Sequence, residues 1–236
     1  RGNPMYFSYG SGDGIYIILL LVVMGISMYA QSKVQRTFNQ FSQTYVSSGL
    51  RADEIAQQLL NRAGSSVQIQ PVQGTLTDHY DPRSGIVGLS TQVYGQSSIA
   101  AVAVAAHEIG HVMQYQEGYG PIRLRNAILP VANIGSYAAP WIVILGLFMG
   151  SYNLAMVGVV LFGAMLVFQV VTLPVEFNAS SRALRMLEEG NYITYDESDG
   201  AKKVLNAAAM TYVWAAVASL ISFLRLLAMA NRSRRN

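Results

Sequence analysis

The chain of 236 residues contains no cysteine and only three histidines, His79, His107 and His111. Without cysteine the protein has no disulfide bonds, no cysteine-ligated iron–sulfur cluster and no zinc site built from thiolates. Any metal site must therefore use histidine and carboxylate side chains. Charged residues make up only 12% of the chain, whereas soluble domains have about 25%. This shortage of charge argues against an ordinary soluble domain.

Hydrophobic residues, 52% of the chain, are concentrated in long blocks. Such blocks are typical of membrane-spanning helices, which need about 20 mostly apolar residues. We expect the first block to be an uncleaved span; a cleaved signal peptide is the alternative. The last block contains Arg225, which is costly in a membrane unless it reaches the interface or faces protein. The four blocks are Ile15–Ala30, Ala127–Met149, Asn153–Leu173 and Ala207–Ala230.

The basic residues predict how the chain is oriented in the membrane. The net charge is +3, and basic residues cluster near the ends of the apolar blocks. We interpret them as a topology signal and not as a nucleic-acid-binding surface. If the first block spans, most basic residues share one side, which the positive-inside rule makes cytoplasmic. The tail residues Arg232, Arg234 and Arg235 conflict with this orientation, so either the tail is an exception to the rule or the last block stays on the cytoplasmic side.

The polar region after the first block is expected to contain helices, strands and a turn. Asp81-Pro82-Arg83-Ser84-Gly85 is a good turn sequence, so the segments on either side should form a β-hairpin. Ser97 or Ser98 can cap a following helix, and Gly118 can end it. The expected helices are Lys33–Ser48, Asp53–Ala63 and Ser97–Glu117, and the expected strands are Val67–Gln70, Thr75–Tyr80 and Ile86–Ser90.

The most informative motif is His107-Glu108-Ile109-Gly110-His111. Two histidines four residues apart lie on one face of a helix, so both imidazoles can bind one zinc ion beside the glutamate. A catalytic zinc site has three protein ligands and one open position for water. The motif supplies two, and no histidine follows it. The third ligand must therefore be a carboxylate downstream or His79 upstream.

Glu176 is the strongest candidate for that third ligand. It begins a helical stretch directly after the apolar block that ends at Pro174. Two predicted spans lie between His111 and Glu176, so the chain crosses the membrane and returns to the same side. The alternative role for Glu176 is an acidic residue at a helix N-terminus that favours the helix dipole.

These residue types predict a peptidase mechanism. Bound zinc would make water a nucleophile at neutral pH, because it lowers the pKa of that water towards about 7. Glu108 would accept the proton of the water and pass it to the leaving amine. A further hydrogen-bond donor would stabilise the tetrahedral oxyanion.

Four segments of the chain carry a family resemblance: LTDHYDPRSGIVGLS, AAHEIGHVMQ, LPVANIG and LPVEFNASSRA. Together they resemble the YugP-type neutral zinc metallopeptidases of bacterial membranes. The similarity runs from the first apolar block to the last. It implies a membrane-bound zinc endopeptidase with His107 and His111 as zinc ligands, Glu108 as the general base and Glu176 as the third ligand.

The layout is more distantly similar to the HtpX and Ste24 membrane proteases, which usually show E-x-x-x-D at the third ligand. In this chain the residue four positions after Glu176 is Ser180. The carboxylate that would orient a zinc-bound histidine is therefore absent. We expect Asn178 or Ser180 to take its place through a hydrogen bond.

Two further residues are candidate donors to the oxyanion. His79 and Tyr80 lie in Asp78-His79-Tyr80-Asp81, next to the expected turn. A polar cluster that anchors the turn is the alternative. The strand they belong to could be an exposed edge that pairs with an extended substrate. We interpret Arg182 and Arg185, one and two turns after Glu176, as positive charge near the membrane.

The expected fold is a mostly α-helical integral membrane protein with a small α+β zincin-like catalytic part, made of the HExxH helix and a short β-hairpin. The expected segments are an N-terminal transmembrane helix (1–32), a catalytic region with the HExxH helix (33–126), a transmembrane helical hairpin (127–173), a third-ligand helix and loop (174–206) and a C-terminal transmembrane helix with a basic tail (207–236).

The protein is predicted to be a zinc-dependent endopeptidase. We expect it to cross the bacterial cell membrane several times and to have its catalytic face in the cytoplasm. Its partners would be Zn2+, the lipid bilayer and a protein or peptide substrate near the membrane, with no nucleic acid; a homo-oligomer or a membrane partner protein stays open. A non-catalytic scaffold stabilised by a closed zinc site, with His79 as fourth ligand, is the alternative. A small transporter is disfavoured because the spans hold almost no ionisable residues besides Arg225.

Overall fold

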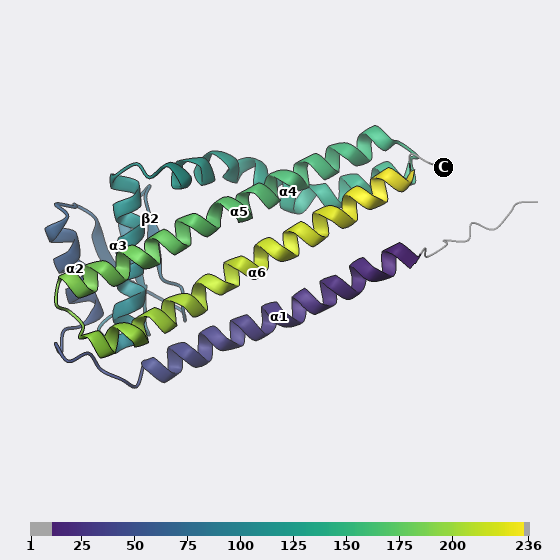
Figure 1. Ribbon diagram of the computed structural model, residues 1–236. Coiled ribbons are helices and arrows are strands. Elements are labelled where there is room, and N and C mark those ends of the chain that lie inside the picture. The colour runs from purple at the N-terminus through teal and green to yellow at the C-terminus, as the bar shows by residue number, and fades with distance from the viewer. Residues whose placement is uncertain (1–10, 234–236) are drawn as a thin grey trace, which may run out of the picture. The chain divides into compact units, whose positions relative to one another are not determined.

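A computed structural model describes residues 11–233, with side chains described for residues 14–232. The first ten residues and the tail arginines Arg234 and Arg235 lie outside this range. The described chain is mostly helical (Figure 1). In chain order its elements are α1 (Ser11–Phe41), α2 (Ala52–Arg62), β1 (Gln68–Val72), β2 (His79–Asp81), β3 (Ile86–Ser90), α3 (Ile99–Gln116), α4 (Gly120–Phe148), α5 (Tyr152–Glu189) and α6 (Tyr195–Ser233).

The chain divides into two compact units, which are described separately. Among the described residues, the bundle unit comprises 11–29, 127–170 and 213–233, and the mixed unit comprises 30–126 and 171–212. Each of α1, α4, α5 and α6 contributes one part to each unit. The segment boundaries expected from the sequence at 32/33 and 173/174 therefore fall inside continuous helices.

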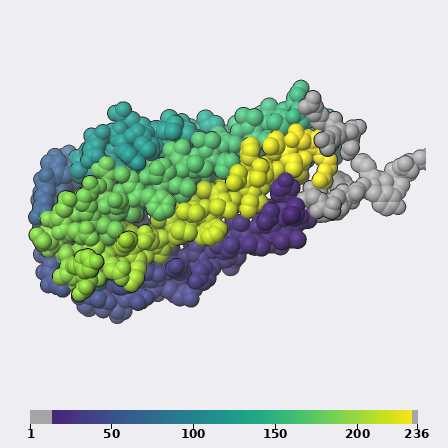
Figure 2. Space-filling view, viewed as in Figure 1, coloured from purple at the N-terminus to yellow at the C-terminus, as the bar shows by residue number. Residues whose placement is uncertain are grey.

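The bundle unit is held together by small residues and apolar side chains. A Cβ atom at Gly158 of α5 would lie 2.8 Å from the carbonyl oxygen of Ala139 in α4, so only glycine permits this approach. Close packing through small residues is typical of helices within a membrane. Phe223 of α6 packs against the cluster of Val143 and Val159, and the yellow end of α6 lies against green α5 in Figure 2.

Within the described residues, four helices are long and apolar enough to cross a membrane: α1, α4, α5 and α6. Large apolar side chains of the bundle unit point outward, including Phe148 (89% exposed), Trp141 (72%) and Val160 (68%). A soluble protein rarely exposes a wide apolar surface. The acyl chains of a bilayer would cover these side chains, so the structure agrees with the expectation of a multi-pass membrane protein.

The mixed unit has its own core around the first half of α3. Ser98 caps α3 by accepting a hydrogen bond from the backbone N–H of Ala101, as expected. The alanine-rich turns that follow are fully buried against α2, β3 and the mixed-unit parts of α5 and α6. Because alanine side chains are small, neighbouring elements approach α3 closely. The HExxH motif occupies the second half of this buried helix.

The sheet has the order β1-β3-β2. The expected hairpin is confirmed, since β2 and β3 pair antiparallel, with His79 opposite Gly88. Its first strand is shorter than expected: it begins at His79 and not at Thr75. Gly74 and Leu76 have positive φ angles of 114° and 53°, which interrupt an extended strand. The edge strand β1 pairs parallel to β3.

Two expected helix boundaries are wrong. The first apolar block and Lys33 belong to the single helix α1, which ends at Phe41 and does not reach Ser48. No proline or glycine lies between the block and Lys33, so nothing in the sequence stops the helix there. Similarly, α5 continues through Pro174. Proline removes one backbone donor, but a long helix keeps its remaining hydrogen bonds on either side.

Candidate metal centre

The two histidines of the motif lie on one face of α3 in the mixed unit. The ring centroids of His107 and His111 are 4.7 Å apart and the rings are nearly perpendicular. Both side chains are largely shielded from solvent. This arrangement follows directly from the four-residue spacing on a helix.

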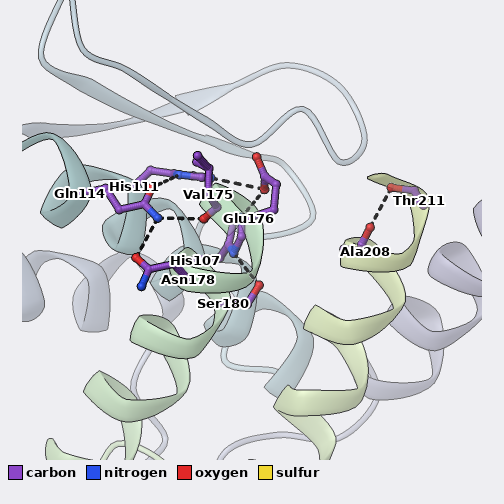
Figure 3. A network of polar contacts seen from close by, with 9 residues as sticks. All are labelled: His107, His111, Gln114, Val175, Glu176, Asn178, Ser180, Ala208 and Thr211. Carbon is purple, nitrogen blue, oxygen red and sulfur yellow. Dashed lines mark hydrogen bonds and ion pairs between the residues drawn. The ribbon is translucent and has the colours of Figure 1, made fainter. Parts of the chain in front are cut away.

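Glu176 approaches both imidazoles from the mixed-unit part of α5 (Figure 3). Its Oε2 atom lies 3.3 Å from Nε2 of His107 and 3.6 Å from Nε2 of His111. The two helices can come this close because of Gly110: a Cβ atom there would lie 2.6 Å from the carbonyl oxygen of Ala179. The glycine inside the motif therefore brings Glu176 to the histidines.

This group of side chains has the chemistry and spacing of a zinc site. The three ligand atoms lie within 4.8 Å of one another. In a tetrahedral zinc site with bonds of about 2.0–2.1 Å, neighbouring ligand atoms are about 3.4 Å apart. The two distances from Glu176 to the imidazoles match that edge length. Two histidines and one glutamate are also a ligand set of catalytic zinc sites.

Gln114 fixes the orientation of His111. Its side-chain oxygen lies 3.0 Å from Nδ1 of His111. Its nitrogen donates to the backbone oxygen of Val175 at 2.8 Å and to the side-chain oxygen of Asn178 at 3.0 Å. Because the side-chain nitrogen of Gln114 donates to these two acceptors, the atom that faces His111 is its oxygen. An amide oxygen can only accept, so Nδ1–H of His111 is the donor. The lone pair on Nε2 of His111 then faces Glu176, as a metal ligand requires.

Ser180 is the corresponding partner of His107. Its hydroxyl oxygen lies 3.1 Å from Nδ1 of His107, and the residue is buried. The structure thus contains the hydrogen bond that was expected from Asn178 or Ser180 in place of a carboxylate. Asn178 acts one step further out, through Gln114.

Glu108 points into the same site but lies outside the group of three ligand atoms. The residue is only 7% exposed. Burial raises the pKa of its carboxyl group, against the opposing effect of His107 and His111. Asp78 is also near: burial raises the pKa of Asp78, although two hydrogen bonds from Ser90 oppose that increase.

A polar hollow of about 190 Å³ lies beside these residues within the mixed unit. Its wall includes His79 and Tyr80, so the structure brings both sequence candidates to the site. Gly88, opposite His79 in the sheet, leaves room for the imidazole. Nδ1 of His79 bonds the backbone oxygen of Thr77 at 2.9 Å, and this oxygen can only accept. A neutral His79 ring therefore presents an acceptor, not a donor, at Nε2.

Tyr80 keeps its phenolic proton at neutral pH. Burial and the neighbouring Tyr115 and Asp81 raise its pKa further. The ring packs edge to face against that of Tyr115, with centroids 5.5 Å apart. The alternative weighed for this segment, a polar cluster that anchors the turn, holds for Asp81, which accepts hydrogen bonds from the backbone N–H of Arg83 and the hydroxyl of Ser84.

Several residues at the site were missed by the sequence reasoning. Arg125 and Tyr212 also line the polar hollow, and Nε of Arg125 is buried without a hydrogen-bond partner among the described residues. Arg182, interpreted from sequence as positive charge near the membrane, pairs with Glu117 at 2.8 Å and donates to Asn178. This pairing lowers the pKa of Glu117. The one sequence signal that could have indicated Arg125 is that it is an arginine soon after the motif.

In the part of the chain that the structure describes, four apolar helices and a cluster of two histidines and one glutamate together define a membrane protein with a candidate zinc site. The family described as "Putative neutral zinc metallopeptidase" matches residues 16–231, and the chain belongs to this family. It is similar to the "Putative membrane protease YugP" of Bacillus subtilis (strain 168), with 46% identity over 212 residues, 89% of this chain and 94% of that protein. No solved structure matches the chain.

Proposed function

We propose that the protein is a zinc-dependent endopeptidase of the bacterial membrane that cleaves membrane proteins or unfolded segments near the bilayer. The observation that carries this proposal is the convergence of His107, His111 and Glu176 on one point, with Glu108 buried beside it. Family membership and the membrane protease relative support it. A catalytic site also needs an open position, and among the described residues no fourth ligand joins the cluster.

In this proposal each residue of the metal centre has a definite role. His107, His111 and Glu176 would hold a zinc ion, whose chemistry when bound would be to activate a water molecule and to polarise the scissile carbonyl. Glu108 accepts the proton of the attacking water and delivers it to the leaving amine. Its buried position keeps this proton from bulk solvent. Ser180 and Gln114 orient the imidazoles through their Nδ1 atoms.

The oxyanion of the tetrahedral intermediate needs a donor, which we place in the polar hollow. Tyr80 suits this task because its phenol stays protonated. His79 remains a candidate only as an imidazolium ion, since its neutral ring presents an acceptor. The edge strand β2, which carries both residues, could pair with an extended substrate.

We propose that the catalytic face is cytoplasmic. The mixed unit contains most of the basic residues, among them Lys33, Arg51, Arg83, Arg123 and Lys202. The positive-inside rule places such a region in the cytoplasm. Of the basic tail residues that conflict with this orientation, Arg234 and Arg235 lie outside the described residues. We also propose that the segments expected from the sequence have the roles given there, with the catalytic residues in segments 33–126 and 174–206.

Removal of zinc is expected to abolish cleavage. Purified protein in detergent micelles is dialysed against a chelator and then assayed on an unfolded protein substrate. Cleavage should disappear and return on addition of Zn2+, because the histidine and glutamate ligands by themselves cannot activate water. Mg2+, which prefers all-oxygen sites, serves as the control that does not restore activity. Cleavage that persists after zinc has fallen to background would refute the proposed function.

A further inference from the structure

A second hollow, of about 170 Å³, adjoins the candidate metal centre within the mixed unit. We call it the apolar hollow, because α1, α3, α6 and the segment before β2 contribute mainly apolar side chains to its wall. These include Phe38, Leu76, Val104, Leu205, Ala208 and Ala209. It is distinct from the polar hollow, whose wall carries His79, Tyr80 and Arg125.

The residues of the metal centre form the wall that the two hollows share. His107, Glu108 and Glu176 line both of them. A group held in the apolar hollow therefore lies next to the carboxylate that we propose transfers the proton. On the other side, the polar hollow offers hydrogen-bonding groups suited to the main chain of a peptide. A substrate bound across the metal centre would place one side chain in the apolar hollow.

The volume fits one bulky side chain. An apolar cavity of about 150 Å³ is large enough to bind benzene. Binding of a large apolar side chain is favourable because it leaves water for an apolar surface. A charged side chain would lose its hydration there, and an acidic one would also be repelled by the carboxylates of Glu108 and Glu176 at one end of the hollow.

We propose that the apolar hollow binds a large apolar side chain, such as that of leucine, methionine or phenylalanine, on the substrate residue next to the scissile bond. This inference rests on the proposed function and specifies its substrate class. A lipid acyl chain is the other apolar group available to a membrane protein. The shared wall with Glu108 and Glu176 favours the peptide, because it places the occupant at the reacting centre.

The test measures binding without catalysis. Zinc-loaded Glu108→Gln protein in micelles is titrated with two fluorescent peptides that differ only in a central leucine or alanine. One methylene in an apolar pocket is worth about 10–200-fold, so the leucine peptide should bind at least about tenfold more tightly. Cleavage sites of an unfolded protein treated with the wild type are mapped in parallel by mass spectrometry and should adjoin large apolar residues.

Substitutions that change the size of the hollow provide the matched comparison. Ala208→Leu, added to the Glu108→Gln protein, fills the hollow and should remove the preference for leucine. Asn206→Leu adds the same side chain to an exposed position of α6 outside the apolar hollow, and should leave the preference intact. Val104→Ala enlarges the hollow and should shift the preference from leucine towards phenylalanine.

Equal affinities for the two peptides, or a leucine preference that survives Ala208→Leu, would overturn the inference. So would a co-purifying lipid that Ala208→Leu displaces while peptide preference is unchanged, since a lipid would then be the occupant. Zinc-dependent cleavage without any preference refutes the apolar subsite and leaves the proposed function standing. Preferential binding of leucine without cleavage by the wild type refutes the peptidase, and with it the placement of the side chain next to a scissile bond, and leaves only the preference of the hollow for a large apolar side chain.

Discussion

The Glu108→Gln protein is expected to bind zinc like the wild type and to lose about 10²–10⁴-fold in kcat/KM, the usual contribution of a general acid–base group. Glutamine has nearly the same shape as glutamate but cannot accept and return a proton at neutral pH. Zinc should remain because Glu108 is not one of the three clustered ligand residues. The assay combines cleavage of a quenched fluorescent peptide with metal analysis by mass spectrometry.

Glu189→Gln is the matched control for this substitution. It removes one carboxylate from an exposed position at the end of α5, so both activity and zinc content should stay at wild-type levels. If the Glu108→Gln protein cleaves the peptide as fast as the wild type, Glu108 is not the proton-transfer group. Loss of zinc from that protein would instead give Glu108 a role in metal binding.

The Glu176→Ala protein is expected to lose zinc and, with it, peptidase activity. Only two histidines would then remain, and catalytic zinc sites use three protein ligands. Ser180→Ala is the graded comparison, because Ser180 orients His107 without joining the ligand cluster. Loss of such a partner typically weakens metal binding by about 10–100-fold. Zinc dissociation constants, measured by competition with a fluorescent chelator, should therefore increase moderately for Ser180→Ala and most for Glu176→Ala.

Folding must be checked for this pair of variants, because both positions are buried. Circular dichroism of the purified proteins in the same detergent should show unchanged helix content. A folded Glu176→Ala protein that holds zinc as tightly as the wild type would exclude Glu176 as the third ligand. His79 would then have to be reconsidered, as the remaining histidine of the chain.

Local features of the site were predictable because they depend on neighbouring residues. Ser98 caps α3 as its residue type and position suggest, and the four-residue spacing places His107 and His111 on one face of that helix. The proximity of Glu176 followed from a different argument, the count of membrane crossings between it and the motif. Both expectations hold in the geometry of the site.

Features that depend on packing between distant segments were not predictable from one sequence. Gln114 has the pattern of an ordinary polar residue in a helix, and only the fold brings Val175 and Asn178 to its amide. Arg125 likewise becomes part of the site only because its helix begins beside the polar hollow.

Some helix boundaries were predicted wrongly for a related reason. Local propensity predicted an end at Pro174, yet α5 continues through it. In a long apolar helix the surroundings favour internal hydrogen bonds so strongly that a single missing donor does not end the helix.

X-ray absorption spectroscopy at the zinc edge of the purified wild-type protein tests the central claim most directly. We predict one zinc ion per chain with two imidazole nitrogens, carboxylate oxygen and one further oxygen that does not come from the protein. That last ligand should be displaced by a hydroxamate inhibitor. A spectrum that requires three imidazoles, or four protein ligands with no exchangeable position, would contradict a glutamate-completed catalytic site and favour a structural zinc scaffold.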